Sequence, residues 1–282
     1  MTGPILKFFA AAASVFLVAC GAPFPSVDDQ QFDYSSSQVP DGTEIFERSL
    51  QAHDLAESGR GVGLRNLRVA TTGSWPWLVT KVQPLMTDDA WRTHGDEYLD
   101  LKTGYYEALF TGPAGSKRVL RTPQAIEVYY NGVPSEDDDV LKASALTSDA
   151  AWLFYLGPRA LQNKQYAFTR LDDASEDGRN YYRIHSTVQP GFGYSEQDQL
   201  VFWIDPDTSL VYRTHMTLNG FRNTRGAHVD VTVREYQQVG GQLLPQRLFE
   251  RVRGPIAIDV HDWWTTSIEL NTATAAVPAA PE

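Results

Sequence analysis

Residues 226–236 read Gly-Ala-His-Val-Asp-Val-Thr-Val-Arg-Glu-Tyr, and apolar and polar side chains alternate along this stretch. In an extended chain every second side chain points to the same face. The apolar residues therefore share one face: Ala227, Val229, Val231 and Val233. This period of two is typical of a β-strand with one buried face. The stretch predicts a sheet that covers an apolar core.

Similar runs of β-branched and aromatic residues, bounded by Gly, Pro, Asn and Asp, lie on both sides of this stretch. We expect strands at residues 64–71, 75–82, 97–102, 105–111, 117–121, 125–130, 166–171, 180–188, 199–205, 210–218, 226–236, 242–253 and 256–270. An open sheet of more than about ten strands has to curl. The sequence thus predicts a mainly β (α+β) fold, a large curled antiparallel sheet, or half-barrel, covered by a few helices.

Two of the predicted strands have a more detailed pattern. Residues 199–205 are apolar on both faces, with Phe202 on one face and Val201 and Trp203 on the other, which predicts a strand buried on both sides. Within residues 256–270, six apolar residues are predicted to share one face: Ile256, Ile258, Val260, Trp264, Ile268 and Leu270.

Two helical segments interrupt the strands. The first is expected at residues 43–56, where Asp41 and Glu44 have the spacing of a capping box. The second is expected at residues 147–162, after an acidic run at 135–139 that we interpret as a solvated loop. Because the second segment is too apolar to lie in water, we expect both helices to cover the apolar face of the curled sheet.

The amino terminus has the layout of a secretory signal. Lys7 is followed by an apolar run at residues 8–19, which is shorter than the about 20 residues that a membrane-spanning helix needs. The run ends in Leu17-Val-Ala-Cys20, which resembles a lipobox, and Cys20 is the only cysteine of the chain. We expect Cys20 to be the lipid attachment site. The alternative is an ordinary signal peptide with a chance cysteine.

The predicted domain organisation follows from these segments. Residues 1–19 are expected to be the lipoprotein signal peptide and residues 20–40, rich in Pro, Ser, Asp and Gln, a flexible tether. Residues 41–270 form the half-barrel domain, and residues 271–282 a disordered tail. The formal net charge of −11, without a basic cluster, argues against nucleic acid as a partner.

Two sequence segments, together with the opening helix, point to a known superfamily. They are Ala151-Trp-Leu-Phe-Tyr-Leu-Gly-Pro158 and the hairpin Val201-Phe-Trp-Ile-Asp205-Pro-Asp-Thr-Ser-Leu-Val211. The order of elements over most of residues 41–270 resembles the half-barrel superfamily of periplasmic lipoprotein carriers, outer-membrane lipoprotein receptors and related lipid-binding lipoproteins, with the LolA/LolB-like fold. Resemblance to lipoproteins with a residue other than aspartate after the cysteine, here Gly21, implies the outer membrane, facing the periplasm.

The resemblance also implies a hydrophobic cavity between the concave sheet and the covering helices. We therefore expect a chain anchored to the membrane that binds a lipid or another hydrophobic ligand. The residues expected to line or close the cavity are Phe46, Leu50, Trp152, Phe154, Leu156 and Phe202. The alternative, from a different class, is a non-catalytic interaction module that docks on an envelope protein through its sheet edges.

Catalytic and metal-binding motifs are not apparent in the sequence. The six histidines are dispersed, without the compact spacing of a zinc site, and no Gly-x-Ser-x-Gly elbow occurs. Asp137, Asp138 and Asp139 could hold a hard cation, but a solvated loop is the favoured interpretation. We expect no cofactor, no metal and no enzyme activity. Because this fold has been recruited for catalysis in a pigment pathway, titratable groups inside the cavity would favour the enzyme hypothesis.

Overall fold

The computed structural model describes residues 21–30, 32–33, 40–53 and 63–272. The predicted signal peptide, Cys20 and most of the predicted tail lie outside the described residues. Within the described residues, no helix combines the length and the apolar character that crossing a membrane requires.

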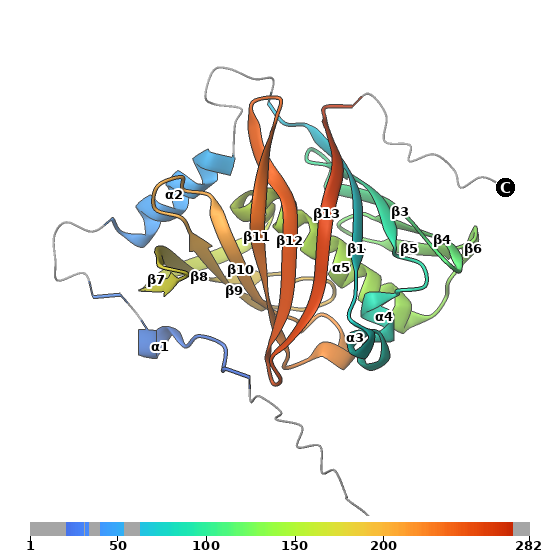
Figure 1. The fold of residues 1–282 in the computed structure, drawn as a ribbon, viewed down its shortest axis with the longest axis horizontal. Coiled ribbons are helices and arrows are strands. Elements are labelled where there is room, and N and C mark those ends of the chain that lie inside the picture. Colours follow the sequence, from blue (N-terminus) through green and yellow to red (C-terminus); the bar gives the residue numbers. More distant parts are fainter. Residues whose placement is uncertain (1–20, 31, 34–39, 54–62, 273–282) are drawn as a thin grey trace, which may run out of the picture.

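Thirteen strands of the described residues form one antiparallel sheet with the spatial order β6-β5-β4-β3-β2-β1-β13-β12-β11-β10-β9-β8-β7 (Figure 1). Their bounds are β1 (Asn66–Ser74), β2 (His94–Asp100), β3 (Tyr105–Gly112), β4 (Gly115–Arg121), β5 (Ile126–Tyr130), β6 (Val133–Pro134), β7 (Gln165–Glu176), β8 (Arg179–Gln189), β9 (Asp198–Ile204), β10 (Val211–Thr217), β11 (His228–Val239), β12 (Gln242–Gly254) and β13 (Ile258–Leu270). The sheet curls but stays open, because its edge strands β6 and β7 do not pair. The predicted half-barrel is confirmed.

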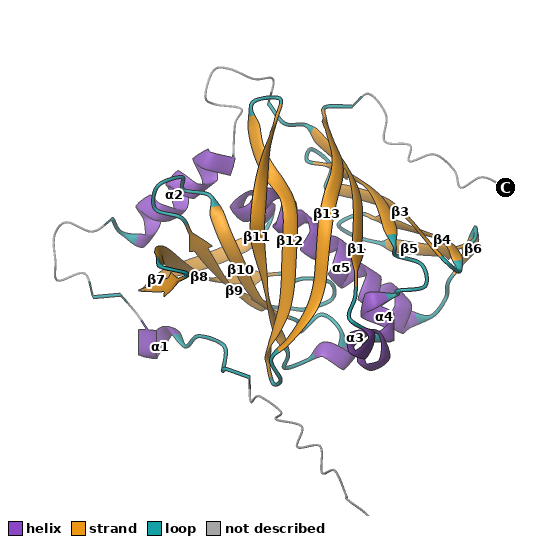
Figure 2. Cartoon of the chain, in the orientation of Figure 1, coloured by secondary structure: helices purple, strands orange, loops and turns teal. Residues whose placement is uncertain are grey.

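The helices of the described residues are short except for two (Figure 2). They are α1 (Val27–Gln30), α2 (Gly42–His53), α3 (Trp77–Val82), α4 (Pro84–Thr87) and α5 (Asp138–Leu156), with 3₁₀ turns η1 (Gly157–Leu161) and η2 (Arg222–Thr224). Helices α2 and α5 pack on the concave face, as predicted. At the start of α2, the backbone N–H of Glu44 donates to the Asp41 carboxylate over 2.8 Å, which is half of the predicted capping box.

Two predictions of secondary structure are wrong. Residues 75–82, predicted as a strand, form a two-residue connection after β1 and helix α3, which follows Pro76 as its N-cap and buries Val79. The second long helix begins at Asp138, well before residue 147. The Asp137 carboxylate accepts hydrogen bonds from the N–H groups of Asp139 and Val140, so part of the acidic run caps a helix instead of forming a solvated loop.

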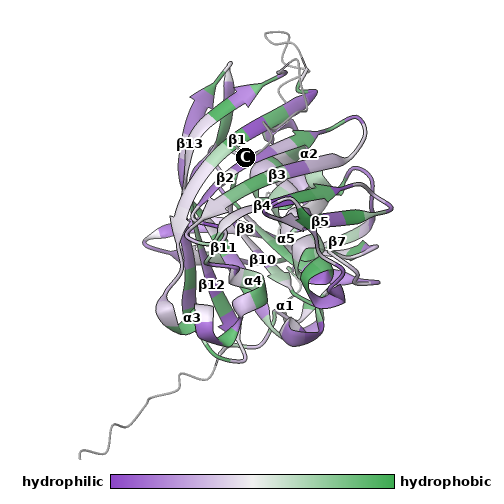
Figure 3. Ribbon diagram, turned by 90° about the vertical axis from the view of Figure 1, so that its right-hand side faces the viewer, coloured by the Kyte–Doolittle hydropathy of each residue, from purple (hydrophilic) through white to green (hydrophobic). Residues whose placement is uncertain are grey.

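The apolar face of β11 is confirmed, because Val229, Val231 and Val233 are all buried in the core. The opposite face is buried as well, since His228, Asp230 and Thr232 are 6%, 2% and 6% exposed, so the expectation of a single buried face is wrong there. Hydrophilic and hydrophobic segments alternate along the strands (Figure 3). The predicted pattern of residues 256–270 is wrong at two residues. Ile256 lies in the connection before β13 and is 49% exposed. Register shifts against β1 and β12 turn Trp263 into the core at 8% exposure and leave Trp264 outside at 38%.

The convex face of the sheet is partly covered by the amino-terminal segment. His185, Val201 and His215 are direct neighbours across β8, β9 and β10. The Phe24 ring lies 4.7 Å from that of His215 and 6.4 Å from that of His185, measured between ring centroids. Val201 is fully buried, so this segment supplies the second cover that the two-sided pattern of β9 predicts.

Candidate ligand-binding cavity

A cavity of ≈ 720 Å³ lies between the concave face of the sheet and helices α3, α4 and α5. Its sheet wall comes from β1, β2, β3 and β10 to β13. Its helix wall is mainly apolar and includes Leu78, Val79, Met86, Ala150 and Phe154. A volume of this size falls within the range of pockets that enclose small molecules, about 300–1,000 Å³.

The six residues predicted to line the cavity lie in different places. Phe154 lines it. Phe46 and Phe202 pack together beneath α2, with ring centroids 6.5 Å apart. Leu50 packs on the same cluster, while Trp152 and Leu156 belong to the core cluster beneath α5. These five residues fill space between helix and sheet, so the cavity wall is built by other side chains.

Sequence reasoning missed the part of the wall that α3 and α4 contribute. Leu78, Val79 and Met86 lie in the segment that was expected to be a strand or a loop. The available signal was the pair Pro76 and Pro84, because proline is favoured at the start of a helix.

An aromatic stack forms one side of the cavity. The His261 imidazole lies parallel to the Trp75 indole, with ring centroids 3.7 Å apart and an interplanar angle of 6°. The Trp263 ring also stacks with His261, with centroids 4.5 Å apart and an interplanar angle of 21°. Gly73 makes room for the stack, since a Cβ there would lie 2.8 Å from His261 Nε2. Burial lowers the pKa of His261 well below its ordinary value, and the Arg92 charge adds to this effect.

A buried carboxyl group, that of Glu97, reaches the cavity from β2 and is only 6% exposed. It accepts hydrogen bonds from the hydroxyl groups of Tyr106, over 2.6 Å, and Tyr155, over 3.0 Å. Burial raises the pKa of Glu97, and these hydrogen bonds oppose the rise. Because Tyr155 belongs to α5, the carboxyl group also fastens this helix to the sheet.

Two further polar groups line the cavity. The Arg92 guanidinium lies 4.8 Å from the Phe110 ring centroid, and its Nη1 donates to the backbone oxygen of Met86 over 3.0 Å. Glu250 lies directly opposite His261 in the register of β12 and β13. Burial raises the pKa of Glu250 to about 7, and the nearby charge of Arg92 limits the rise. A mostly apolar cavity thus has a polar side.

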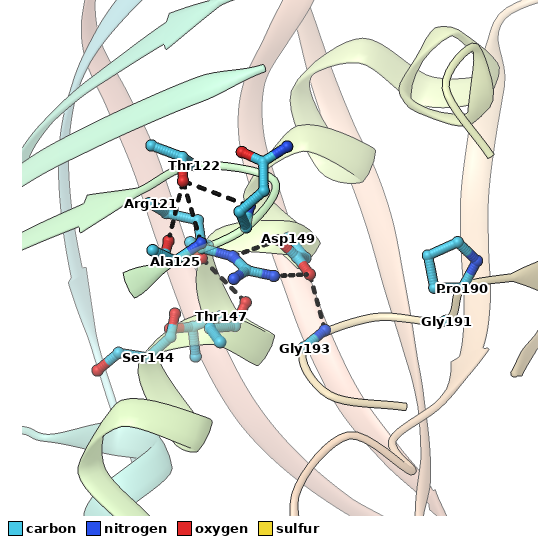
Figure 4. A network of polar contacts seen from close by, with 12 residues as sticks. Arg121, Thr122, Ala125, Ser144, Thr147, Asp149, Pro190, Gly191 and Gly193 are labelled. Atoms are coloured by element: carbon cyan, nitrogen blue, oxygen red, sulfur yellow. Dashed lines mark hydrogen bonds and ion pairs between the residues drawn. The ribbon is translucent and has the colours of Figure 1, made fainter. Parts of the chain in front are cut away.

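Polar contacts near the middle of helix α5 tie it to two parts of the fold (Figure 4). The Asp149 carboxylate pairs with Arg121 of β4 at 3.3 Å and accepts the backbone N–H of Gly193 over 2.8 Å. Arg121 lies on β4, and Gly193 lies in the connection between β8 and β9, which are near the other edge of the sheet. Asp149 therefore joins the helix to both parts of the fold.

The histidines that are dispersed in the sequence partly come together in space. On the convex face, His215 Nε2 lies 2.7 Å from His228 Nδ1, and Phe24 contacts both rings. Burial lowers the pKa of His215 to about 3. Within the described residues, no group of three or more His, Cys, Asp or Glu side chains is arranged to hold a metal ion.

Comparison with known proteins gives the fold. No protein-family model and no curated protein sequence matches the chain. The structure is similar to the crystal structure of a LolA superfamily protein from Nitrosomonas europaea, with a TM-score of 0.50 and 13% identity over 84% of this chain and 96% of that chain. A DUF1329 family protein from Desulfovibrio piger has a TM-score of 0.48, with 13% identity and the same coverage, 84% and 96%. The chain has the LolA/LolB-like half-barrel fold.

Proposed function

We propose that this chain is a membrane-anchored lipoprotein that binds a hydrophobic or amphiphilic ligand, of the lipid class, in the half-barrel cavity. The observation that carries the proposal is the ≈ 720 Å³ cavity, whose wall is mostly apolar. Burial of apolar ligand surface contributes about 25 cal/mol per Å². The polar groups Arg92 and Glu250 give a ligand with a polar end one preferred orientation.

The anchoring part of the proposal rests on the sequence. Cys20 follows a signal-like run and is the proposed lipid attachment site, and Gly21 in place of aspartate after it supports the outer membrane, facing the periplasm. Two or more acyl chains on one residue hold a protein stably, whereas one chain binds weakly. Replacing Cys20 by Ser should abolish incorporation of labelled palmitate and release the protein from the membrane fraction. A parent chain that incorporates no labelled palmitate would refute the lipid anchor but would not affect the proposal for the cavity.

The ligand is tested on protein purified from cells without detergent. Extraction and mass spectrometry should recover a lipid in near-stoichiometric amount, and titration of the delipidated protein with lipids should restore binding. Ala150→Phe places a ring in the cavity and should abolish binding, whereas Ala114→Phe, at an exposed turn, should leave it unchanged. An empty cavity that takes up no lipid would contradict the proposal.

A second candidate is an enzyme that acts on the bound amphiphile, and one observation favours it. Glu250 and His261 face each other across two strands and both line the cavity. A carboxyl group with a pKa of about 7 can both accept and release a proton near neutral pH. Turnover of lipid esters that Glu250→Gln abolishes would support this function. Recovery of the added esters unchanged would leave binding as the activity.

A further inference from the structure

Large apolar side chains are exposed around the mouth of the cavity. Trp77 is 72% exposed, Leu78 50% and Val82 63%, all on α3, and Ile256 is 49% exposed between β12 and β13. These residues, here called the apolar rim, are four of the nine large hydrophobic side chains that are exposed within the described residues. Leu78, Val82 and Ile256 also line the cavity, so the apolar rim surrounds its opening.

The fold itself gives no reason for this exposure. Helix α3 has six residues, of which only Val79 is buried, so most of its apolar surface faces outward. The β12–β13 connection adds the exposed residues Pro255 and Ala257 on either side of Ile256. Contiguous exposed apolar surface on a folded domain usually marks an interaction site. Two elements far apart in the sequence thus build one surface.

The position of the amino-terminal segment identifies what covers this surface. The backbone N–H of Gly21 donates to the backbone oxygen of Pro255 over 2.9 Å, next to Ile256. Gly21 is tightly seated, because a Cβ there would lie 2.2 Å from the Arg253 oxygen. Figure 1 places this start of the described chain, the β12–β13 turn and α3 at the same end of the molecule. The covalent bond to Cys20 leads directly from this place.

We propose that the apolar rim rests on the lipid bilayer and that the cavity opens toward it. The inference rests on the lipid anchor proposed above. The Cα atoms of Cys20 and Gly21 are about 3.8 Å apart, because a peptide bond joins the two residues. Gly21 is hydrogen-bonded next to Ile256, so acyl chains on Cys20 would bring the bilayer to the apolar rim. Trp77 belongs to a residue type enriched at membrane interfaces. Lys81 of α3 and Arg225, which lines the cavity, are both exposed, so two basic side chains lie beside the apolar rim.

This orientation has a consequence for ligand transfer. A lipid that leaves the bilayer would enter between α3 and the β12–β13 turn without exposing its acyl chains to water. The acyl anchor and the apolar rim are then two separate membrane contacts, and together they fix the orientation of the domain, which a single contact would leave free.

The test places an environment-sensitive dye on the full-length chain, processed in cells and reconstituted in vesicles of phosphatidylethanolamine and phosphatidylglycerol. Leu78→Cys carries the dye in the apolar rim. Leu243→Cys is the matched control, because Leu243 is 41% exposed in the β11–β12 hairpin at the opposite end of the sheet. We expect blue-shifted emission and strong quenching by lipids with brominated acyl chains at position 78, and neither effect at position 243. Val82→Cys should behave as Leu78→Cys does.

The outcomes separate the two proposals. An acylated Cys20 has no free thiol, so dye uptake by the parent chain would refute the anchor without bearing on the rim. Water-like emission at both positions 78 and 82 in vesicles would overturn the rim proposal. A third outcome is a dye at position 78 that is already shielded from water before lipid is added, together with crosslinking of two chains at this position. It would show that the apolar rim contacts a second copy of the chain, and it would overturn the proposal as well.

Discussion

Asp149, in the middle of α5, pairs with Arg121 of β4 at 3.3 Å while its other oxygen accepts the N–H of Gly193. Asp149→Asn keeps an acceptor for Gly193 but removes the ion pair, in which both side chains are largely buried. We expect a loss of about 2 kcal/mol in the free energy of unfolding, measured in urea. Asp138→Asn, which breaks an exposed pair with Lys142 in the same helix, should cost less than about 0.5 kcal/mol. Equal losses would refute the special role of Asp149.

Asp137 should stabilise the start of α5 through its two hydrogen bonds to backbone N–H groups. Asp137→Ala leaves these groups without their acceptor and should lower the free energy of unfolding by about 1 kcal/mol. Glu136→Ala, one residue earlier and exposed, is the control and should have little effect. The midpoints of thermal unfolding of the two variants measure the effect. An unchanged midpoint in Asp137→Ala would contradict the proposed capping role of Asp137.

Glu250 should make the stability of the protein fall with rising pH over a defined window. Its pKa is about 7 in the folded chain, above its ordinary value of 4.5, so the folded chain holds a proton that the unfolded chain releases. The stabilisation is complete below pH 4.5 and is lost as the pH rises through 7. Between pH 4.5 and 7, the free energy of unfolding should depend less on pH in Glu250→Gln than in the parent chain. The same pH dependence of the free energy of unfolding in parent and variant would show that Glu250 does not titrate in this range.

Phe24 should protect the convex face at His215 and Val201. Phe24→Ala removes a ring that lies 4.7 Å from the imidazole of His215, so water gains access to both residues. Because burial holds the pKa of His215 at about 3, we expect this pKa to rise toward its ordinary value of 6.5. Titration by NMR measures the change. Pro23→Ala, at an exposed neighbour, is the control, and an unmoved pKa in Phe24→Ala would refute the contact.

Much of the fold could be predicted from local patterns. The alternation along residues 226–236 placed Val229, Val231 and Val233 in the core correctly, and the Asp41 and Glu44 spacing located the start of α2. The β13 pattern failed at Trp264, because register shifts against β1 and β12 reverse the phase and such bulges leave no mark on a count of every second residue.

The candidate site was harder to predict than the sheet. Phe46 and Phe154 are both phenylalanines on helices that face the sheet, yet Phe46 fills the core and Phe154 lines the cavity. Their difference depends on which elements lie opposite each ring in the folded chain, and no local pattern contains that information. Glu97 of β2 and Glu250 of β12 both line the cavity, although they are far apart in the chain. Their meeting could not be predicted from local patterns either.

The sequence by itself determined the curled antiparallel sheet and its covering helices, because side-chain periodicity and helix caps are local properties of the chain. It also singled out Cys20 as the residue for the proposed anchor. Only the tertiary structure decided that Leu78 and Ile256 share the mouth of one cavity and that Gly21 is hydrogen-bonded to Pro255, next to Ile256. These are contacts between segments remote in the sequence, and packing of the whole sheet brings them together.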